Sequence, residues 1–216
     1  MMAERSQLWV EGTDDDHTIR HLLIRHGVEY DHKPWPAKVP SIEQAGDKEQ
    51  LLRTVKLGIS ASSGRAVGFV LDADFSLQDC WQSILSRLRE AGVDAPQDIP
   101  HEGFVGESRS YNTRVGVWLM PDNQQGGALE NFLTTLIEEK NQLLFHAQAS
   151  TIQAKNGHGA NFRDVDKNKA VLHAWLAWQE VPGLPYGTAM KARYFRQDSP
   201  VAERFVAWFR HVFQLQ

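Results

Sequence analysis

The stretch VGFVLDAD, residues 67–74, indicates the fold class. Its residues are apolar almost without interruption until the chain reaches Asp72 and Asp74. Such runs are typical of strands in a parallel sheet that is covered by helices on both faces. Ligands of these sheets bind beyond the carboxyl ends of the strands, so the two aspartates are expected where a functional site would lie.

Two more apolar runs end in acidic residues. LWVEGTDDD (8–16) reaches Glu11 and three aspartates, while VGVWLMPDN (115–123) reaches Asp122 and precedes Glu130. Carboxylates gathered at one sheet edge repel one another, and a hard divalent cation would relieve that repulsion. Oxygen ligands without a nearby cysteine favour Mg²⁺, Mn²⁺ or Ca²⁺.

Periodicity predicts alternating strands and helices, which is the pattern of a parallel α/β sheet. Strands are expected at 7–11, 66–71 and 115–120, and helices at 15–26, 47–58, 77–91 and 128–141. A further strand is expected between the first two helices. The proline-containing stretches 32–41 and 96–106 are expected to be irregular.

The last third of the chain changes character. Residues 156–166 are rich in Gly, Asn and His and are expected to form a mobile loop. Two aromatic-rich helices follow, at 167–179 and 200–213, separated by VPGLPYG. Aromatic residues at helical spacing are more often core than a cofactor box, so these helices are expected to form a lid packed on the sheet.

The composition is that of an ordinary globular protein, with 216 residues, 42% hydrophobic and 23% charged. The single cysteine, Cys80, excludes an internal disulfide and fits a cytoplasmic location. No signal peptide is evident, and no run approaches the roughly 18 apolar residues that span a bilayer, so no membrane association is expected. A net charge of −4 argues against a basic nucleic-acid coat, but bound metal would offset the acidic clusters.

The order of acidic strand ends resembles the Toprim domain, the metal-binding module of topoisomerases, primases and the overcoming-lysogenization-defect nucleases. The shared pattern is a Glu-Gly pair, an aspartate four residues after the glutamate, and a later Asp-x-Asp: Glu11, Gly12, Asp15, Asp72 and Asp74. The resemblance covers about residues 7–140. The chain lacks a tyrosine-bearing cleavage domain and a primase region, which leaves the nuclease branch as the implied relative.

Longer segments are similar to DUF3226, an uncharacterised bacterial and archaeal family with a Toprim-like fold. These are VEGTDDDHTI, VLDAD, RVGVWLMPDN with LENFL, and KAVLHAWLAWQEVPG. The resemblance implies one Toprim-like, Rossmann-like domain over residues 1–216, with a mostly parallel sheet flanked by helices. Its core would cover about 7–140, and a C-terminal helical lid would cover about 150–216.

The resemblance also implies roles for individual residues. Glu11 would be a metal ligand or general acid/base, and Asp72 with Asp74 would hold Mg²⁺ or Mn²⁺. Asp15 matches a further acid of the nuclease branch, and Glu130 or Asp122 would help to hold a second ion. Gly12 would let the backbone approach an anion or metal after the strand. The alternative reading is that acids at these turns only cap helices.

A nuclease also needs a cation near the phosphate in the transition state. Lys169 is the first candidate, because it begins the KAVLH stretch after the predicted mobile loop, and Lys167, Lys56 and Arg65 are alternatives. Each lysine or arginine has a second reading as a solvated surface charge. His17, Lys155 and His158 are weaker candidates for contacts with the metal or the substrate.

The resulting hypothesis is a metal-dependent nuclease that uses one or two Mg²⁺ or Mn²⁺ ions and acts on DNA or RNA, with a defence-system effector as one biological setting. Two rivals stay open. One is a non-catalytic metal-binding protein that works beside an ABC-type ATPase, which must be supplied in trans because the chain has no P-loop. The other is a phosphatase or phosphotransferase for small nucleotides. The oligomeric state stays open, a homodimer included.

Overall fold

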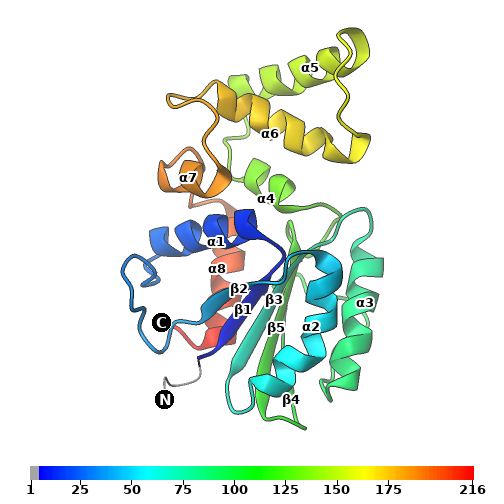
Figure 1. Cartoon of the computed structure of the whole chain (residues 1–216), viewed down its shortest axis with the longest axis vertical. Helices are drawn as coiled ribbons and strands as arrows, with labels where there is room; N and C mark the ends of the chain where they lie inside the picture. The colour runs from blue at the N-terminus through cyan, green and yellow to red at the C-terminus, as the bar shows by residue number, and fades with distance from the viewer. Residues whose placement is uncertain (1–4) are drawn as a thin grey trace.

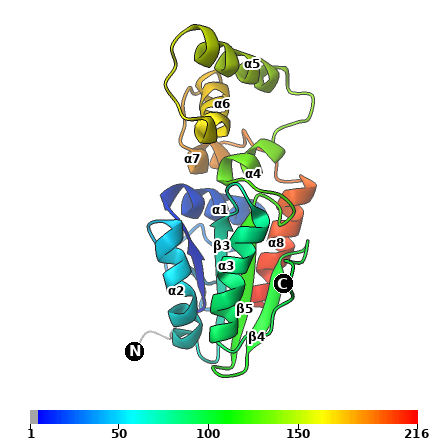
Figure 2. The same ribbon diagram turned by 90° about the vertical axis from the view of Figure 1, so that its right-hand side faces the viewer.

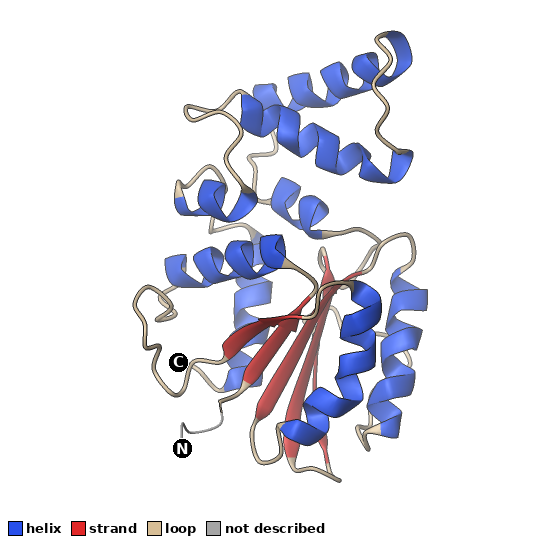
Figure 3. Ribbon diagram, viewed as in Figure 1, coloured by secondary structure: helices blue, strands red, loops and turns tan. Residues whose placement is uncertain are grey.

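A five-stranded sheet organises the protein. The computed structural model describes residues 5–216. The strand order is β2-β1-β3-β5-β4, in which β4 is antiparallel to β5 and the other neighbours are parallel. The strands are β1 Gln7–Val10, β2 Ser41–Gln44, β3 Ala66–Asp72, β4 Phe104–Ser108 and β5 Thr113–Met120. This mostly parallel sheet with flanking helices confirms the predicted fold class (Figure 3).

Helices cover both faces of the sheet (Figures 1 and 2). Alternate residues of β3 serve different layers, since Phe69 packs in the cluster that includes Trp81, whereas Val70 packs in the cluster that includes Phe209. The first cluster contains residues of α2 (Lys48–Ala61) and α3 (Leu77–Glu90), and the second contains residues of α1 (Thr13–Arg25) and α8 (Pro200–Phe213). Burial on both faces explains the uninterrupted apolar run of β3.

Two glycines let α8 lie close to the sheet. Gly68 and Gly116 are partners in the register between β3 and β5. A Cβ atom on Gly116 would lie 2.3 Å from Cγ2 of Val212, and one on Gly68 would lie 2.8 Å from Leu8 and 3.1 Å from Phe213. These separations are shorter than van der Waals contact, so the α8 interface depends on residues without side chains at both positions.

A second group of helices lies beyond the carboxyl ends of the strands (Figure 1). It comprises α4 Leu129–Thr135, α5 Gln142–Gly157, the short 3₁₀ helix η1 Asp164–Asp166, α6 Lys167–Ala177 and α7 Tyr186–Lys191. Helices α5 and α6 pack against each other, α6 contacts α4, and α7 packs on α1. This group stands over the sheet edge where the predicted acidic residues lie.

The two aromatic-rich C-terminal helices are present, and they have different neighbours. Helix α8 covers the sheet through Phe205, Trp208 and Phe209, whereas α6 packs against α5 and α4. Both positions are consistent with core aromatics. Within residues 5–216, no helix combines the length and apolar character that crossing a bilayer requires.

Some elements differ from the sequence prediction. Strand β4 lies within and after the stretch expected to be a loop, and its FVGES sequence gives little strand signal. The helix expected at 128–141 ends at Thr135, where the hydroxyls of Thr134 and Thr135 donate to main-chain carbonyls, an interaction that competes with helical hydrogen bonding. Helix α5 was not predicted, because its apolar residues do not form one stripe.

Candidate active site

The ends of β1 and β3 are joined through acidic side chains. The Asp72 amide donates to Oε1 of Glu11 at 2.9 Å, because β1 and β3 are neighbours in the sheet. Asp72 in turn accepts a hydrogen bond from the Leu129 amide at 3.0 Å through its Oδ1. Leu129 begins α4, and the preceding Ala128 has no side-chain acceptor. Asp72 therefore both faces the site and caps this helix.

Asp15 reaches the same region from the first turn of α1. Its Oδ2 accepts a hydrogen bond from the Gly12 amide at 3.0 Å. The Gly12 backbone is extended, with φ of −146°, and a Cβ atom there would meet only Asp15, at 3.7 Å. Neither the backbone conformation nor the neighbouring protein atoms therefore require a glycine at this position, and the approach of an anion or metal to Gly12 stays a prediction.

Burial and mutual repulsion alter the acidity of these carboxyl groups. Burial raises the pKa of Glu11 to about 7, and the charge of Asp15 adds to the rise. Burial likewise raises the pKa of Asp15 to about 6, with a contribution from Glu130. The pKa of Asp72 lies well above its usual range, first because it is buried and then because Asp15, Glu11 and Glu130 are near.

These four residues, Glu11, Asp15, Asp72 and Glu130, are called the acidic cluster below. They come from β1, α1, β3 and α4, and their charges act on one another. Glu11 and Asp72 were predicted from strand ends, and Asp15 was singled out among three aspartates by the Toprim resemblance. The fourth, Glu130, was predicted as an alternative to Asp122.

Asp74 is held by a lysine that the sequence analysis did not single out. Nζ of Lys48 lies 2.5 Å from Oδ2 of Asp74 and donates to the Asp72 carbonyl at 2.7 Å. Lys48 begins α2 just after β2, so the sheet order brings it to the same edge. The signal in the sequence that could have indicated Lys48 is its position just after a strand.

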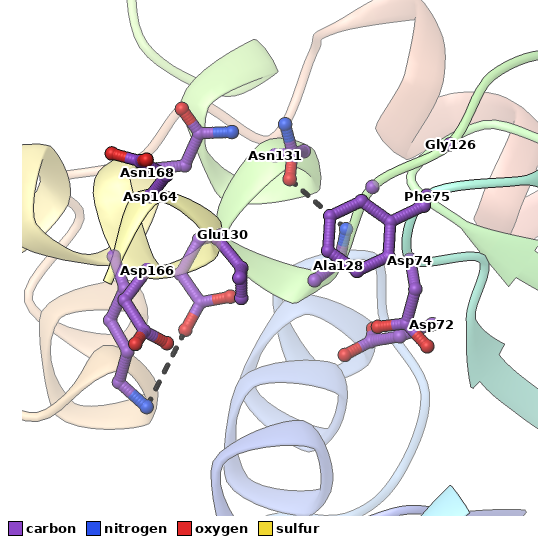
Figure 4. A pocket seen from close by; sticks show the side chains of 13 residues that line it. Asp72, Asp74, Phe75, Gly126, Ala128, Glu130, Asn131, Asp164, Asp166 and Asn168 are labelled. Carbon is purple, nitrogen blue, oxygen red and sulfur yellow. Dashed lines mark hydrogen bonds and ion pairs between the residues drawn. The ribbon is translucent and has the colours of Figure 1, made fainter.

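A cavity of about 460 Å³ opens beside Asp72, Asp74 and Glu130. Its other wall consists of residues from η1 and the start of α6, which are Asp164, Val165, Asp166, Asn168 and Lys169. Nζ of Lys169 lies 3.8 Å from Oε1 of Glu130, and Figure 4 shows Glu130 across the cavity from Asp72 and Asp74. The structure thus brings Lys169 to the predicted site. The stretch expected to be a mobile loop supplies part of the wall, which the sequence did not reveal.

Glu130 is also contacted by a buried tyrosine. The Tyr186 hydroxyl lies 3.4 Å from Oε1 of Glu130 and 3.2 Å from Nε2 of His173, and the rings of His173 and Tyr186 stack. Burial raises the pKa of Tyr186, so the hydroxyl stays protonated and can donate to the carboxylate. Helices α6 and α7 therefore help to position Glu130.

Asp122 does not join the acidic cluster. It is buried in the turn after β5, where its side chain accepts hydrogen bonds from the Gln124 amide at 3.0 Å and from the Gln125 side chain at 3.1 Å. It is not among the residues that line the cavity. The acid at this strand end is engaged by its own turn, and Glu130 takes the place expected for it.

The alternative cations lie in different settings. Lys56 pairs with Glu90 at 3.6 Å between α2 and α3, and Arg65 precedes β3, at the opposite edge of the sheet from the acidic cluster. Lys155 pairs with Asp164 at 2.5 Å. Lys167 is exposed at the start of α6 and does not line the cavity.

His17 and His158 also lie outside the cavity lining. His17 lies in α1 beneath α7, where a Cβ atom on Gly187 would come within 2.5 Å of it. His158 follows the end of α5. Of the weaker candidates, neither histidine therefore faces the cavity.

The donor atoms fit a hard divalent cation. Glu11 and Asp72 each use one oxygen for a backbone amide, and within residues 5–216 no hydrogen bond occupies the other oxygen of either. Burial is the first cause of the raised pKa of Glu11 and Asp72, and the neighbouring carboxylates raise the pKa of both groups further, so a divalent cation would offset negative charge here.

The side chains do not form a ready-made coordination group. Among residues 5–216, no three His, Cys, Asp or Glu side chains already converge as a metal-binding group. Glu11 and Asp72 meet as expected, whereas Asp74 is turned to Lys48 instead of sharing one group with them. Metal binding would therefore require local side-chain movement.

The fold and the acidic cluster define an α/β protein with a carboxylate-rich cavity at the carboxyl edge of a parallel sheet. The family model described as "Protein of unknown function (DUF3226)" matches residues 5–214, so the chain belongs to this family. Searches of curated proteins and of solved structures gave no match.

Proposed function

We propose that this protein is a metal-dependent phosphodiester hydrolase with a Toprim-like site that acts on nucleic acid in the cytoplasm. The observation that carries the proposal is the acidic cluster, in which carboxylates from β1, α1, β3 and α4 are buried near one another beside a cavity that also presents Lys169. Buried charges of one sign are costly unless they are protonated or paired with a cation. Such an arrangement at a ligand-binding edge favours a functional role over a purely structural one.

The acidic cluster would hold one or two Mg²⁺ or Mn²⁺ ions. Glu11 and Asp72 offer their second oxygens, while Asp15 and Glu130 add carboxylates of the same type. When bound, the cation would stabilise charge on phosphate oxygens and promote ionisation of water. Asp74 becomes available as a further ligand once it leaves Lys48.

The protein's own residues account for proton transfer and charge stabilisation. In the metal-free site the pKa of Glu11 is raised to about 7, so its carboxyl group can hold a proton at Oε2 near neutral pH while Oε1 stays bound to the Asp72 amide. A cation bound at Oε2 would displace that proton and make Glu11 a ligand instead. Lys169 lies across the cavity, where its ammonium group can face a phosphate oxygen. It is half-exposed and therefore free to leave Glu130 for a substrate.

Most of the charged side chains that line the cavity are negative, so a phosphate substrate would need a bound divalent cation in order to enter. Five carboxylates line it, on Asp72, Asp74, Glu130, Asp164 and Asp166, and Lys169 is the cation among the lining residues. Lys48, Lys155 and Arg163 pair with Asp74, Asp164 and Asp166, so the excess negative charge is concentrated on the acidic cluster. A phosphate would be repelled by this surface unless divalent cations reverse its charge locally. We therefore expect nucleic-acid affinity to depend on divalent metal.

A second candidate is hydrolysis of small phosphorylated nucleotides. A cavity of about 460 Å³ lies within the usual size of small-ligand sites, and the η1 and α6 wall stands across it from the sheet edge. This candidate uses the same acidic cluster and the same metal. It differs from the first candidate because the whole substrate would fit inside the cavity, whereas a nucleic-acid strand would extend beyond it.

The test is a hydrolysis assay with labelled single-stranded and double-stranded DNA and RNA and with mononucleotides, in EDTA, Mg²⁺ or Mn²⁺. Wild type is compared with Glu11→Gln, Asp72→Asn and Asp122→Asn. The expected result is metal-dependent cleavage of nucleic acid that is lost in the first two variants and retained in Asp122→Asn, which alters a buried acid outside the cluster.

The other outcomes separate the rivals. Hydrolysis of mononucleotides alone would replace the first candidate with the second. If the wild type hydrolyses none of these substrates with either metal, alone or with an ABC-type ATPase, the catalytic proposal fails and a non-catalytic partner role takes its place.

A further inference from the structure

Phe75 is a large apolar side chain that is exposed at the candidate active site. Its relative exposure is 86%, the highest among the exposed large hydrophobic residues of the described chain. Single exposed apolar residues are common and need no explanation by themselves. The position of Phe75 is what distinguishes it, because it follows Asp74 directly and lines the cavity beside the acidic cluster.

The backbone that carries Phe75 is fixed on both sides. The Asp74 amide donates to the Gly127 carbonyl at 2.8 Å, and Asp74 has a φ of +53°. A Cβ atom on Gly126 would lie 2.6 Å from the Asp74 carbonyl oxygen and 3.0 Å from the Phe75 carbonyl group, so the two chain segments are in tight contact. On the other side, Ser76 caps α3 by accepting from the Asp79 amide at 3.2 Å.

The backbone that carries the ring is thus held at the cavity by ordered structure. Figure 4 shows the ring on the same side as Asp72 and Asp74, with Glu130 and the residues of α6 across from it. Of the cavity-lining residues, Phe75 is the one aromatic within the described part of the chain. The other exposed aromatics, Phe145 and Trp178, belong to the α5–α6 region and do not line the cavity.

Resting on the proposed function, we propose that Phe75 is a stacking platform for an unpaired nucleobase next to the phosphate that the acidic cluster acts on. An aromatic face attracts any base by stacking, which requires no positive charge beside this carboxylate-rich cavity. A base within a duplex has both faces covered by its neighbours, so stacking on Phe75 selects an unpaired base. The substrate class is therefore a single strand or an unpaired segment.

The test measures binding separately from cleavage. Fluorescence anisotropy of a 5′-labelled oligothymidylate is recorded in Ca²⁺ and in Mn²⁺ for wild type, Phe75→Ala, Phe75→Leu and Phe75→Trp. Loss of one stacked base, worth about 1 to 3 kcal/mol, predicts about 5- to 140-fold weaker binding by Phe75→Ala. Phe75→Leu should resemble Phe75→Ala, because leucine keeps apolar area but has no aromatic face, and Phe75→Trp should retain wild-type affinity.

Phe145→Ala is the matched control, because it removes an exposed phenylalanine that does not line the cavity. It should leave binding unchanged. Equal thermal unfolding temperatures of the four Phe75 proteins would show that the differences do not come from folding, as expected for a side chain that is 86% exposed. A blunt-ended duplex and free thymidine monophosphate are measured in parallel.

The outcomes distinguish this inference from the proposed function. If wild type cleaves nucleic acid and Phe75→Ala binds and cleaves it equally well, the stacking role is wrong and the hydrolase proposal stands. Phe75-dependent binding of the single strand without cleavage would support stacking and count against hydrolysis. If the duplex binds as tightly as the single strand, or if no substrate binds, the inference is wrong. Phe75-dependent binding of the mononucleotide alone would keep the stacking role and overturn the strand as substrate.

Discussion

The backbone amide of Asp72 donates a hydrogen bond to Oε1 of Glu11 at 2.9 Å and so joins the ends of β3 and β1. Asp72 then accepts from the Leu129 amide at the start of α4. Each of the two acids therefore has a structural role, because one of its carboxylate oxygens accepts a backbone hydrogen bond. A neutral side chain could accept the same hydrogen bond, so this role does not require the negative charge. Amide replacements keep an oxygen acceptor and remove the charge, which allows the two roles to be separated.

Asp72→Asn should abolish stabilisation by metal without weakening the metal-free fold. Asparagine keeps an acceptor for Leu129 and removes a carboxylate whose pKa is raised by burial and by three acidic neighbours. At a Mn²⁺ concentration about 100 times its Kd, wild type should gain about 2.7 kcal/mol. This is a rise in Tm of roughly 5 to 11 °C for a domain of this size, measured by calorimetry with Mn²⁺ and with EDTA.

Asp72→Ala provides the comparison for that experiment. It removes the acceptor as well as the charge, so it should lose about 1 kcal/mol in EDTA, as for a missing helix cap. If Asp72→Asn is as unstable as Asp72→Ala in EDTA, Asp72 is chiefly a cap and its metal-binding assignment is wrong.

Glu11→Gln should make the free energy of unfolding of the metal-free protein less dependent on pH. A folded-state pKa of about 7, against an ordinary 4.5, means that the folded protein binds this proton more tightly than the unfolded chain. The stabilising contribution is full below about pH 4.5 and is lost as the pH rises through about 7. At about 1.4 kcal/mol for each pKa unit, Glu11→Gln should be more stable than wild type by about 3 kcal/mol at pH 8 and similar to it at pH 4.

Urea unfolding in EDTA across this pH range measures the difference. Glu107→Gln, an exposed glutamate on β4, serves as the control and should differ from wild type by a constant amount. A difference between wild type and Glu11→Gln that does not change with pH would show that Glu11 is not destabilised by burial.

The sequence predicts the strand ends of this site because their signals are local. The apolar runs of β1, β3 and β5 and the acids after them can be read without knowing the sheet order. Lys48 illustrates what could not be predicted, since it joins the site through the order of the strands. Glu130 was predicted only as an alternative to Asp122, because the path of α4 decides which of the two acids reaches the site.

The cavity wall formed by η1 illustrates the same limit. Its sequence resembles a loop, and its place opposite Asp74 depends on the packing of α6 against α4 and α5. Asp122 shows the converse, because a local signal was present but the side chain is engaged by its own turn.

Gly116→Ala should destabilise the fold without changing the site. Its Cβ atom would clash with Val212 on α8, at 2.3 Å, and approach Trp208 at 3.1 Å. Overpacking of this kind costs about 1 to 3 kcal/mol, and thermal or urea unfolding would measure it. Adding Val212→Ala should recover part of the loss, because it removes the nearest atoms. Gly157→Ala, at a glycine of α5 with open space around it, should leave stability unchanged or slightly raised.

Lys169→Ala should separate charge stabilisation from metal binding. Lys169 lies 3.8 Å from Glu130 and is about half exposed, so the fold depends little on it. If its ammonium group stabilises charge on the phosphate in the transition state, the variant should cleave about 10²-fold more slowly, the scale of losing one preorganised donor. Mn²⁺ affinity, measured by calorimetric titration, should barely change.

Two lysines provide controls for that experiment. Lys167→Ala removes an exposed lysine two residues earlier that does not line the cavity, and it should cleave like wild type. Lys48→Ala breaks the contacts with Asp74 and with the Asp72 carbonyl, so it should alter metal affinity and stability together with cleavage. Full cleavage by Lys169→Ala combined with slow cleavage by Lys48→Ala at saturating metal would transfer the charge-stabilising role to Lys48.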